Sequence, residues 1–486
     1  MNDATQQNPE TDLGARASSG LHRRDFLKYT LAAGLAVPMA GALASCATGG
    51  GSSSGGASGA AAGGAKSDKN PFGIDPKAPV DVVIFKGGFG DQYAIDAGAA
   101  YNTLWGGTVA KVTSTTKINT ELQPRFVGGN PPDIIDNSGA DHIPFAGIQS
   151  QVEPLDDLLT APAVGFDGKT VKDTLIAGAT DPGTYDGKLL EMNYFYTVFG
   201  LWYGAKVFAD NGWTPPSTWA EVMALGEKAK AKGISLFTFG GQNAGDYYHE
   251  LALSMAARKG GVDVIKKIDN LEAGSFAQPA VTEALAAIEA AVKAGYFQPG
   301  GSGMIHTQAQ TQFVQGKALL YPSGSWLENE MKDIMPPDFA MTCLQAPALS
   351  GDVKLKNGYH GAAGEPFIVP KGKNPAGGKE YLRQMLSKEI ASNTAKLVKS
   401  ATIVKGTVPA DGFGSTALAS ATKIQNAGES EAFTWRYSAF YAMSKELKTA
   451  WNTFLSGQMS AADLATKMQS MSDKVREDPS VKKYKV

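Results

Sequence analysis

Short apolar runs alternate with amphipathic stretches along the chain from about residue 80 onward. Residues 82–85 are apolar β-formers and predict a buried strand, and residues 93–104 have the pattern of a helix. A strand over 108–112, a helix over 118–126 and a strand that ends at Asp136 continue the alternation. Strands that alternate with helices predict an α/β layer structure with a largely parallel sheet.

The second half of the chain begins with an extended, unusually aromatic stretch over residues 188–203. Thr218 and Glu221 have the spacing of a capping box and predict the start of a helix. Residues 313–326 predict a strand that runs into a Gly/Ser turn and presents Trp326. A strand-like run follows at 365–370, and further helices are expected over 280–294, 378–387, 390–399, 435–454 and 461–475.

The composition is that of a globular protein. The chain has 486 residues, enough for two or more domains, of which 43% are hydrophobic and 19% charged. The formal charge is −2, from 45 Lys and Arg against 47 Asp and Glu. A balance this even gives no case for a nucleic-acid partner, which needs a basic face.

The two cysteines, Cys46 and Cys343, have no metal-site spacing, and the histidines do not pair at metal spacing either.

The N-terminus has the features of an export signal. Arg23 and Arg24 lie in the run His-Arg-Arg-Asp-Phe-Leu-Lys, which resembles the twin-arginine signal except for His22 in its first place. The mildly apolar stretch that follows, 29–42, is too short and weak to span a bilayer. A cleavable signal over residues 1–45 is the better interpretation.

The signal ends in Leu-Ala-Ser-Cys, which resembles a bacterial lipobox and would place a diacylglycerol with two acyl chains of the palmitate type on Cys46 as a lipid anchor. The alternative is an ordinary signal peptide with a chance cysteine. Residues 46–75 begin with a Gly/Ser/Ala-rich run, which is typical of a flexible tether. An anchor followed by a tether predicts a globular part that works close to a membrane.

Five segments of the globular part, taken in order, resemble the extracellular solute-binding proteins of carbohydrate ABC importers, the maltose-binding-protein-like group. These segments are 126–134, 203–208, 212–221, 313–326 and 366–386. The resemblance implies a two-lobed, periplasmic-binding-protein-like (class II) α/β fold with an interlobe cleft for the ligand. Strands would cross between the lobes near 193–203, 316–323 and 359–367.

By this resemblance the N-terminal lobe comprises 76–195 and 321–365, and the C-terminal lobe 196–320 and 366–486. The lobes are expected to close on sugar by a hinge motion, and the closed form to dock on an ABC permease. The expected protein is a monomer on the extracellular face of the bacterial cell membrane, with no enzymatic activity and no cofactor. Within the family, residues 361–370 resemble the actinobacterial binding proteins for N-acetylglucosamine and chitobiose.

Aromatic candidates for the cleft follow from the chemistry of a sugar ring, whose apolar face packs on flat aromatic rings. Trp326, at a predicted crossing, is the first candidate, with a core tryptophan as its alternative. Tyr196 and Trp202 lie on the first crossing, where strand cores are also aromatic. Trp435 and Arg436 open a late helix and could close the cleft.

Polar candidates must replace the water bonds of the sugar hydroxyls. Glu365 precedes a crossing strand, and its alternative is a solvated loop acid. Asp136 and Asn137 end the third strand, where α/β sheets tend to bind ligands. The remaining polar candidates are Asp91, which follows a Gly-rich loop, and Asn243, Asp246 and Tyr247 in a later polar loop.

Two other functions stay open on the sequence. A surface-anchored glycoside hydrolase needs paired carboxylates, and Glu365 and Asp136 are available in principle. The same binding fold could instead take another oligosaccharide, a peptide or another small solute. The Gly-rich loop at 87–90 lacks the ending of a phosphate-binding loop.

Overall fold

The computed structural model describes residues 64–107, 109–139 and 141–486. The predicted export signal with Arg23 and Arg24 and the predicted lipidation site Cys46 lie outside the described residues. The expected tether, 46–75, is described only from residue 64. Phe72 and Ile74 at its end are 7% and 1% exposed and belong to the hydrophobic core, so the folded body begins before the predicted boundary.

A mixed β-sheet with strand order β2-β1-β3-β10-β6-β8-β7 forms the centre of the fold, with β11 paired to β10 and β9 paired to β6. A separate hairpin joins β4 to β5. The strands are β1 (Val80–Phe85), β2 (Ala110–Thr115), β3 (Ile134–Asp136), β4 (Thr184–Tyr185), β5 (Lys188–Leu189), β6 (Met192–Gly204), β7 (Ser235–Phe237), β8 (Ala318–Gly324), β9 (Met341–Leu344), β10 (Tyr359–Ile368) and β11 (Ala432–Phe433).

The sheet is parallel only toward its two ends. β1 is parallel to β2 and β3, and β7 is parallel to β8. β10 is antiparallel to both β3 and β6, and β6 is antiparallel to β8 and β9. The prediction of a largely parallel sheet is therefore wrong for the centre, because strands that cross from one half to the other run against their neighbours.

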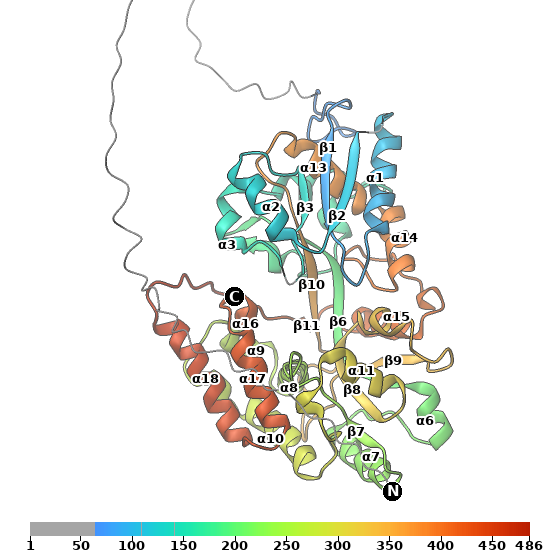
Figure 1. Ribbon diagram of the computed structural model, residues 1–486, viewed down its shortest axis with the longest axis vertical. Helices are drawn as coiled ribbons and strands as arrows, with labels where there is room; N and C mark the ends of the chain where they lie inside the picture. Colours follow the sequence, from blue (N-terminus) through green and yellow to red (C-terminus); the bar gives the residue numbers. More distant parts are fainter. Residues whose placement is uncertain (1–63, 108, 140) are drawn as a thin grey trace, which may run out of the picture. The chain divides into compact units, whose positions relative to one another are not determined.

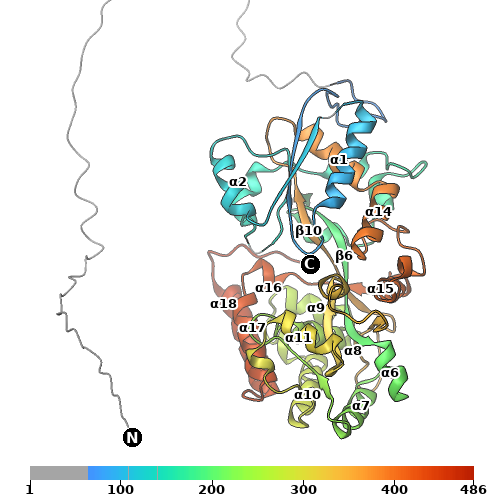
Figure 2. The ribbon, with the colours of Figure 1, turned by 45° about the vertical axis from the view of Figure 1, so that its right-hand side comes forward.

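β6 physically joins the two halves of the sheet. Its first part, Met192 to Val198, pairs with β10, whereas Phe199 to Gly204 pairs with β8 and β9. Figure 1 shows β6 and β10 side by side between an upper group of elements and a lower one, and Figure 2 shows the same arrangement from another side. This is the expected two-lobed α/β fold with crossing strands.

The helices lie around this sheet. Those before β8 are α1 (Gln92–Trp105), α2 (Ile118–Val127), α3 (Phe145–Ile148), α4 (Asp156–Thr160), α5 (Val171–Thr174), α6 (Ala205–Asn211), α7 (Trp219–Ala231), α8 (Tyr247–Gly260), α9 (Val262–Asp269), α10 (Pro279–Lys293) and α11 (His306–Val314). The later ones are α12 (Leu327–Met331), α13 (Pro375–Met385), α14 (Lys388–Val398), α15 (Thr416–Ala427), α16 (Tyr437–Phe440), α17 (Ser444–Leu455) and α18 (Ala461–Glu477).

The start of α7 follows the predicted capping box. The Glu221 backbone N–H donates to Thr218 Oγ1 at 3.2 Å, and the Thr218 N–H donates to Glu221 Oε2 at 3.0 Å. The helix expected over 435–454 is instead two helices, α16 and α17. They are separated at Ala442, whose φ of 55° is incompatible with a continuous helix.

The lobe boundaries expected from the resemblance do not match the packing of two segments. Residues 366–486 were expected in the C-terminal lobe, but α13 and α14 pack on α1, where Tyr381 lies 6.4 Å from Tyr101 between ring centroids. Residues 321–365 were expected in the N-terminal lobe, but β8 and β9 pair with the far part of β6. The expected crossings at 193–203 and 359–367 fall on β6 and β10, but the lobe assigned to α13 and α14 and to β8 and β9 is wrong.

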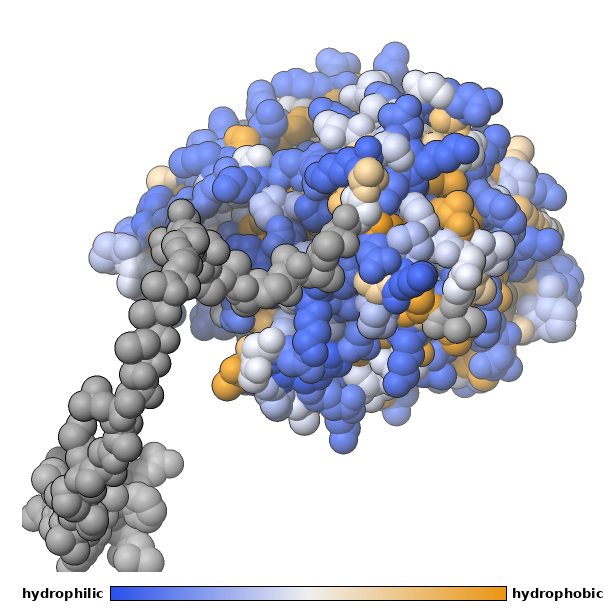
Figure 3. Space-filling view, turned by 90° about the horizontal axis from the view of Figure 1, so that it is seen from above, coloured by the Kyte–Doolittle hydropathy of each residue, from blue (hydrophilic) through white to orange (hydrophobic). Residues whose placement is uncertain are grey.

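The surface seen in Figure 3 is mostly hydrophilic, with apolar residues scattered over it. Along the described part of the chain, no helix combines the length and the apolar character needed to cross a bilayer. Cys343 is a buried free thiol on β9.

Candidate functional site

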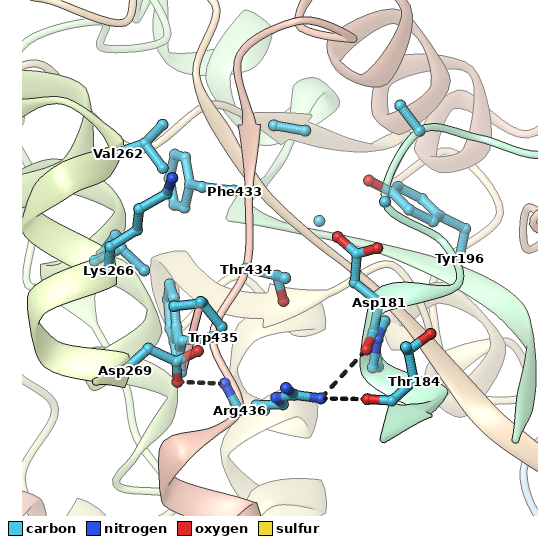
Figure 4. A pocket seen from close by; sticks show the side chains of 17 residues that line it. Asp181, Thr184, Tyr196, Val262, Lys266, Asp269, Phe433, Thr434, Trp435 and Arg436 are labelled. Carbon is cyan, nitrogen blue, oxygen red and sulfur yellow. Dashed lines mark hydrogen bonds between the residues drawn. The ribbon is translucent and has the colours of Figure 1, made fainter. Parts of the chain in front are cut away.

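A pocket of about 470 Å³ opens beside the crossing strands. Tyr196 of β6 and Gly361 of β10 line it from the crossing (Figure 4). One wall comes from the segment around Asp181, which leads into the β4–β5 hairpin, and the opposite wall from α9 and residues 432–436. The pocket is therefore lined from both sides of the crossing, which is where a ligand of a two-lobed fold is expected.

Aromatic and charged groups face each other across this pocket. Phe433 and Trp435 line it from the segment between α15 and α16, and Lys266 lines it from α9. Asp181 and Arg436 add opposite charges. Flat apolar rings with a few convergent polar groups are the lining that a sugar requires, because each ring has apolar faces and a polar rim.

A row of stacked rings connects Trp435 to Trp326. Trp435 stacks on His360 at 3.8 Å between centroids, and His360 stacks on Phe199 at 4.3 Å. Trp326 meets Phe199 edge to face at 5.4 Å and Tyr247 at 6.1 Å. Trp326 is half-buried at the start of α12 but is not among the residues that line the 470 Å³ pocket. We call Trp326, Phe199, His360 and Trp435 the aromatic row.

Two of the predicted aromatic contacts differ sharply in their surroundings. Trp202 is fully buried in the core and donates from Nε1 to the Ser323 carbonyl at 2.8 Å, so it offers no face to a ligand in this structure. The aromatic residues of 188–203 give no sequence signal that separates the buried Trp202 from its neighbours. Tyr196 lines the pocket, and its hydroxyl lies 3.0 Å from that of Tyr359.

The predicted acids Asp136 and Glu365 meet at the junction of β3 and β10. Asp136 is 1% exposed and accepts from the Tyr93 hydroxyl at 3.2 Å and from the Ser138 hydroxyl. Burial raises the pKa of both carboxyl groups, and the negative charge of Glu365 adds to the rise at Asp136. The backbone φ of Glu365 is 57°, a strained value for a non-glycine residue. The negative charge of Glu365 therefore disfavours ionisation of Asp136, because like charges repel strongly in a buried site.

Asn137 has a structural role beside this acid pair. Its Nδ2 donates to the Ile143 carbonyl at 3.0 Å, and its Oδ1 accepts from the Ile143 N–H at 2.8 Å. Asn243 is used in the same way, since its Oδ1 accepts from the His306 N–H at 2.8 Å and its Nδ2 lies 2.8 Å from His306 Nδ1. Both amides are thus committed to holding loops.

The loop after β1 places Asp91 in an ion pair. Asp91 accepts from the Ser114 hydroxyl at 2.6 Å and lies 3.1 Å from Lys86 Nζ. The hydrogen bond from Ser114, with the nearby Lys86, lowers the pKa of Asp91 more than burial raises it. Phe89 in the same loop stacks on Phe195 of β6 at 4.0 Å, a contact that sequence reasoning missed.

Asp246 and Tyr247 begin α8 close to the aromatic row. Burial raises the pKa of Asp246 to about 7, because Lys448, at 4.0 Å, compensates only part of the lost solvation. Tyr247 meets Trp326 and also Tyr321 of β8, at 6.0 Å between ring centroids. The structure thus brings together Trp326 and Tyr247, two candidates from distant parts of the sequence.

Arg436 bridges the two walls of the pocket. Its Nη1 donates to the backbone carbonyls of Asp181 at 3.3 Å and of Thr184 at 3.2 Å, and its backbone N–H donates to Asp269 Oδ1 at 2.9 Å (Figure 4). Its guanidinium also lies 4.1 Å from the centre of the Tyr484 ring. The sequence carries no signal for this contact between Arg436 and Tyr484.

Tyr185 is a further aromatic residue that the sequence analysis did not select. It stacks between Phe145, at 4.7 Å, and Phe440, at 6.4 Å, and its hydroxyl donates to Glu191 Oε2 at 2.7 Å. Burial raises the pKa of Glu191 to about 7. Within residues 64–107, 109–139 and 141–486, no group of three or more His, Cys, Asp or Glu side chains is placed to hold a metal ion.

Comparisons with known proteins agree with this architecture. The model of the family described as bacterial extracellular solute-binding protein matches residues 107–392. The diacetylchitobiose binding protein NgcE of Streptomyces coelicolor is 46% identical over 424 residues, which cover 87% of this chain and 90% of that protein. A probable sugar-binding periplasmic protein of Mesorhizobium japonicum is 26% identical over 300 residues, or 58% of this chain and 67% of the relative.

Solved structures share the fold at low sequence identity. A chitin oligosaccharide binding protein superposes with a TM-score of 0.59 at 19% identity and covers 79% of this chain and 93% of its own. The cyclic α-maltosyl-1,6-maltose binding protein of Arthrobacter globiformis gives a TM-score of 0.63 at 16% identity, over 82% of this chain and 99% of its own. The family model, the long match to the Streptomyces protein and the two-lobed fold identify this chain as a member of the bacterial extracellular solute-binding proteins.

Proposed function

We propose that this protein captures N-acetylglucosamine, chitobiose or both and delivers the sugar to the permease of a carbohydrate ABC importer. The observation that carries the proposal is the 46% identity to a diacetylchitobiose binding protein, because it extends over 87% of the chain and so covers both halves of the fold.

The pocket supports this ligand class physically. Trp435 and Phe433 provide apolar rings for a sugar face, and Lys266, Asp181 and Thr434 provide donors and acceptors for its rim. Each sugar hydroxyl that loses water without finding a partner costs about 1–3 kcal/mol, so a lining of this kind is needed for tight binding. We place one sugar unit here and expect closure of the two halves to complete its contacts.

The other predicted contacts extend the proposed site along the aromatic row. Trp326 and Tyr247 lie at its far end, and Glu365 with Asp136 lies on the other half of the crossing. Glu365 is the member of this pair that we propose for ligand contact, because its Oε2 has no hydrogen-bond partner among the described residues, whereas both oxygens of Asp136 are already used. Trp202, Asn137 and Asn243 are left out of the proposed contacts because their polar atoms are already used.

Binding without catalysis is part of the proposal, and the acid pair supports it. Glycoside hydrolases hold their two carboxyl groups about 5–9.5 Å apart, with the sugar between them. Here Asp136 is 1% exposed and both of its carboxyl oxygens accept hydrogen bonds from Tyr93 and Ser138, so it is not placed to act on a glycosidic bond. Incubation with chitooligosaccharides followed by chromatography tests this, and intact sugar is expected.

Calorimetric titration of the purified protein tests the ligand. N-acetylglucosamine and chitobiose are expected to bind with a saturable heat signal and maltose is expected to bind much more weakly. A response to maltose alone would redirect the proposal to another oligosaccharide, and no response to any of the three sugars would refute sugar capture.

The membrane anchor is a separate part of the proposal. Membership of the extracellular solute-binding family supports work outside the cytoplasm, and the sequence Leu-Ala-Ser-Cys supports lipidation of Cys46. We expect Cys46→Ser to move the protein from the membrane fraction to the medium, and Arg23→Lys with Arg24→Lys to leave it in the cytoplasm. Export of the double-lysine variant at the normal level would instead indicate the general secretory route.

A further inference from the structure

The last residues of the chain return to the proposed sugar pocket. The Tyr484 hydroxyl donates to Asp269 Oδ1 at 2.6 Å, at the end of α9. The Val486 N–H donates to Asn270 Oδ1 at 3.0 Å, and Val486 itself lines the pocket. Figure 1 places this end of the chain beside α16 and α9. The segment is thus fixed against the same wall that carries Trp435 and Arg436.

The Tyr484 ring is in contact with two aromatic rings and one guanidinium group. It stacks nearly parallel to Tyr441, at 5.3 Å between ring centroids and an interplanar angle of 2°, and it meets Phe440 edge to face at 4.8 Å. The Arg436 guanidinium lies 4.1 Å from the centre of the same ring. An arginine over a tyrosine face is attracted by the ring quadrupole and is held in one plane.

In this position the Arg436 side chain extends toward the other wall of the pocket. The accepting carbonyls of Asp181 and Thr184 belong to the turn and hairpin that lead through β5 into β6, on the far side of the pocket (Figure 4). Arg436 is therefore fastened to one wall through Tyr484 and Asp269 and reaches across to the other. These two bonds form only when the two walls are close together.

A free arginine would weaken this bridge. The side chain loses rotamer entropy when it is fixed, and that loss is subtracted from the free energy of closure. Stacking on Tyr484 fixes most of the side chain beforehand, so less entropy is lost when the walls meet.

We infer that Tyr484 is a positioning residue for sugar capture: its ring holds the Arg436 guanidinium ready to bridge to the Asp181 and Thr184 carbonyls when the two halves close. The inference rests on the proposed function, since closure is what retains the sugar. Tyr484 itself need not touch the ligand, because its effect acts through Arg436.

The alternative is that Tyr484 only anchors its own segment through the bond to Asp269. Tyr484→Phe separates the two roles, because it keeps the ring over the guanidinium and removes the hydroxyl bond. Tyr484→Leu removes both. Lys483→Ala is the matched control in the same segment, since Lys483 Nζ donates to the nearby Asp478 carbonyl and, among the described residues, to no other group.

The test measures chitobiose affinity by calorimetry and its dissociation rate by stopped-flow tryptophan fluorescence in the full-length variants. Tyr484→Leu is expected to weaken binding about 2- to 10-fold, mainly through faster dissociation, from the usual size of a cation–π contact. Tyr484→Phe and Lys483→Ala are expected to bind like the unchanged protein. In an Arg436→Ala background, Tyr484→Leu is expected to have no further effect.

Three results would overturn the inference while leaving sugar capture intact. These are unchanged binding by Tyr484→Leu, equal losses for the Phe and Leu variants, and an undiminished loss in the Arg436→Ala background. A lower melting temperature of Tyr484→Leu with unchanged affinity would assign the residue to anchoring alone. If the unchanged protein binds none of the sugars, the proposed function itself fails, and the inference fails with it.

Discussion

Glu191, just before β6, provides a prediction whose size follows directly from its surroundings. The side chain is 7% exposed, and its Oε2 accepts from the Tyr185 hydroxyl at 2.7 Å. Burial raises its pKa from 4.5 to about 7, so the folded protein binds a proton that the unfolded chain releases near pH 4.5. Glu191→Gln removes this titration and keeps an oxygen that can accept from Tyr185.

The sign of the pH dependence follows from the raised pKa. A carboxyl group with a raised folded-state pKa stabilises the protein fully below its unfolded pKa of about 4.5 and loses that contribution as pH rises to about 7. Between pH 5 and pH 8 the free energy of unfolding therefore falls by about 2.5 kcal/mol through this one group. The Gln variant lacks this fall, so it gains about 2.5 kcal/mol on the unchanged protein between these two pH values.

Guanidinium unfolding followed by tryptophan fluorescence at pH 5 and pH 8 measures this difference. The control is Glu227→Gln on the exposed face of α7, which is expected to change stability by less than about 0.5 kcal/mol at either pH. If the stability difference between Glu191→Gln and the unchanged protein is the same at both pH values, Glu191 does not carry a raised pKa and the reasoning is wrong.

Three further perturbations test the site and the fold. Trp435→Ala removes an aromatic ring from the pocket and is expected to weaken chitobiose binding at least about 10-fold in calorimetry. If the variant binds chitobiose as well as the unchanged protein, Trp435 is not part of the site. Gly361→Ala places a methyl group against the Tyr196 hydroxyl and the Tyr359 ring and is expected to reduce sugar affinity, while a normal affinity would show that the pocket adapts. Thr218→Ala removes the cap of α7 and is expected to cost about 1 kcal/mol in chemical unfolding without changing sugar binding, and a change in affinity would contradict the separation of this helix from the site.

Local sequence patterns predicted most of the elements. β1, α1, α2 and β3 lie within a few residues of their expected positions, because short-range apolar periodicity and caps determine them. The break between α16 and α17 was missed because Ala442 carries no local signal for its positive φ. Pairing partners such as β10 with β3 depend on contacts between distant parts of the chain, which periodicity does not encode.

The sequence predicted which kinds of side chain line the candidate site better than it predicted the individual residues. Trp435 and Tyr196 line the pocket, and their contact with a ligand stays a prediction. Trp202 lies on the same strand but is buried in the core. Because most β6 residues on both faces are buried, the sequence shows no alternation of period two that could separate Trp202 from Tyr196. Tyr484 could not be found, since its importance comes only from its contact with Arg436.

The pairing of β3 with β10 has a consequence for how the protein is made. Asp136 pairs with Phe367, so one edge of β3 has no partner until the chain has been synthesised beyond Ile368. At ordinary translation rates that interval lasts about 10 to 50 s. During this time one edge of β3 lacks its native partner, and an open strand edge can pair with another chain.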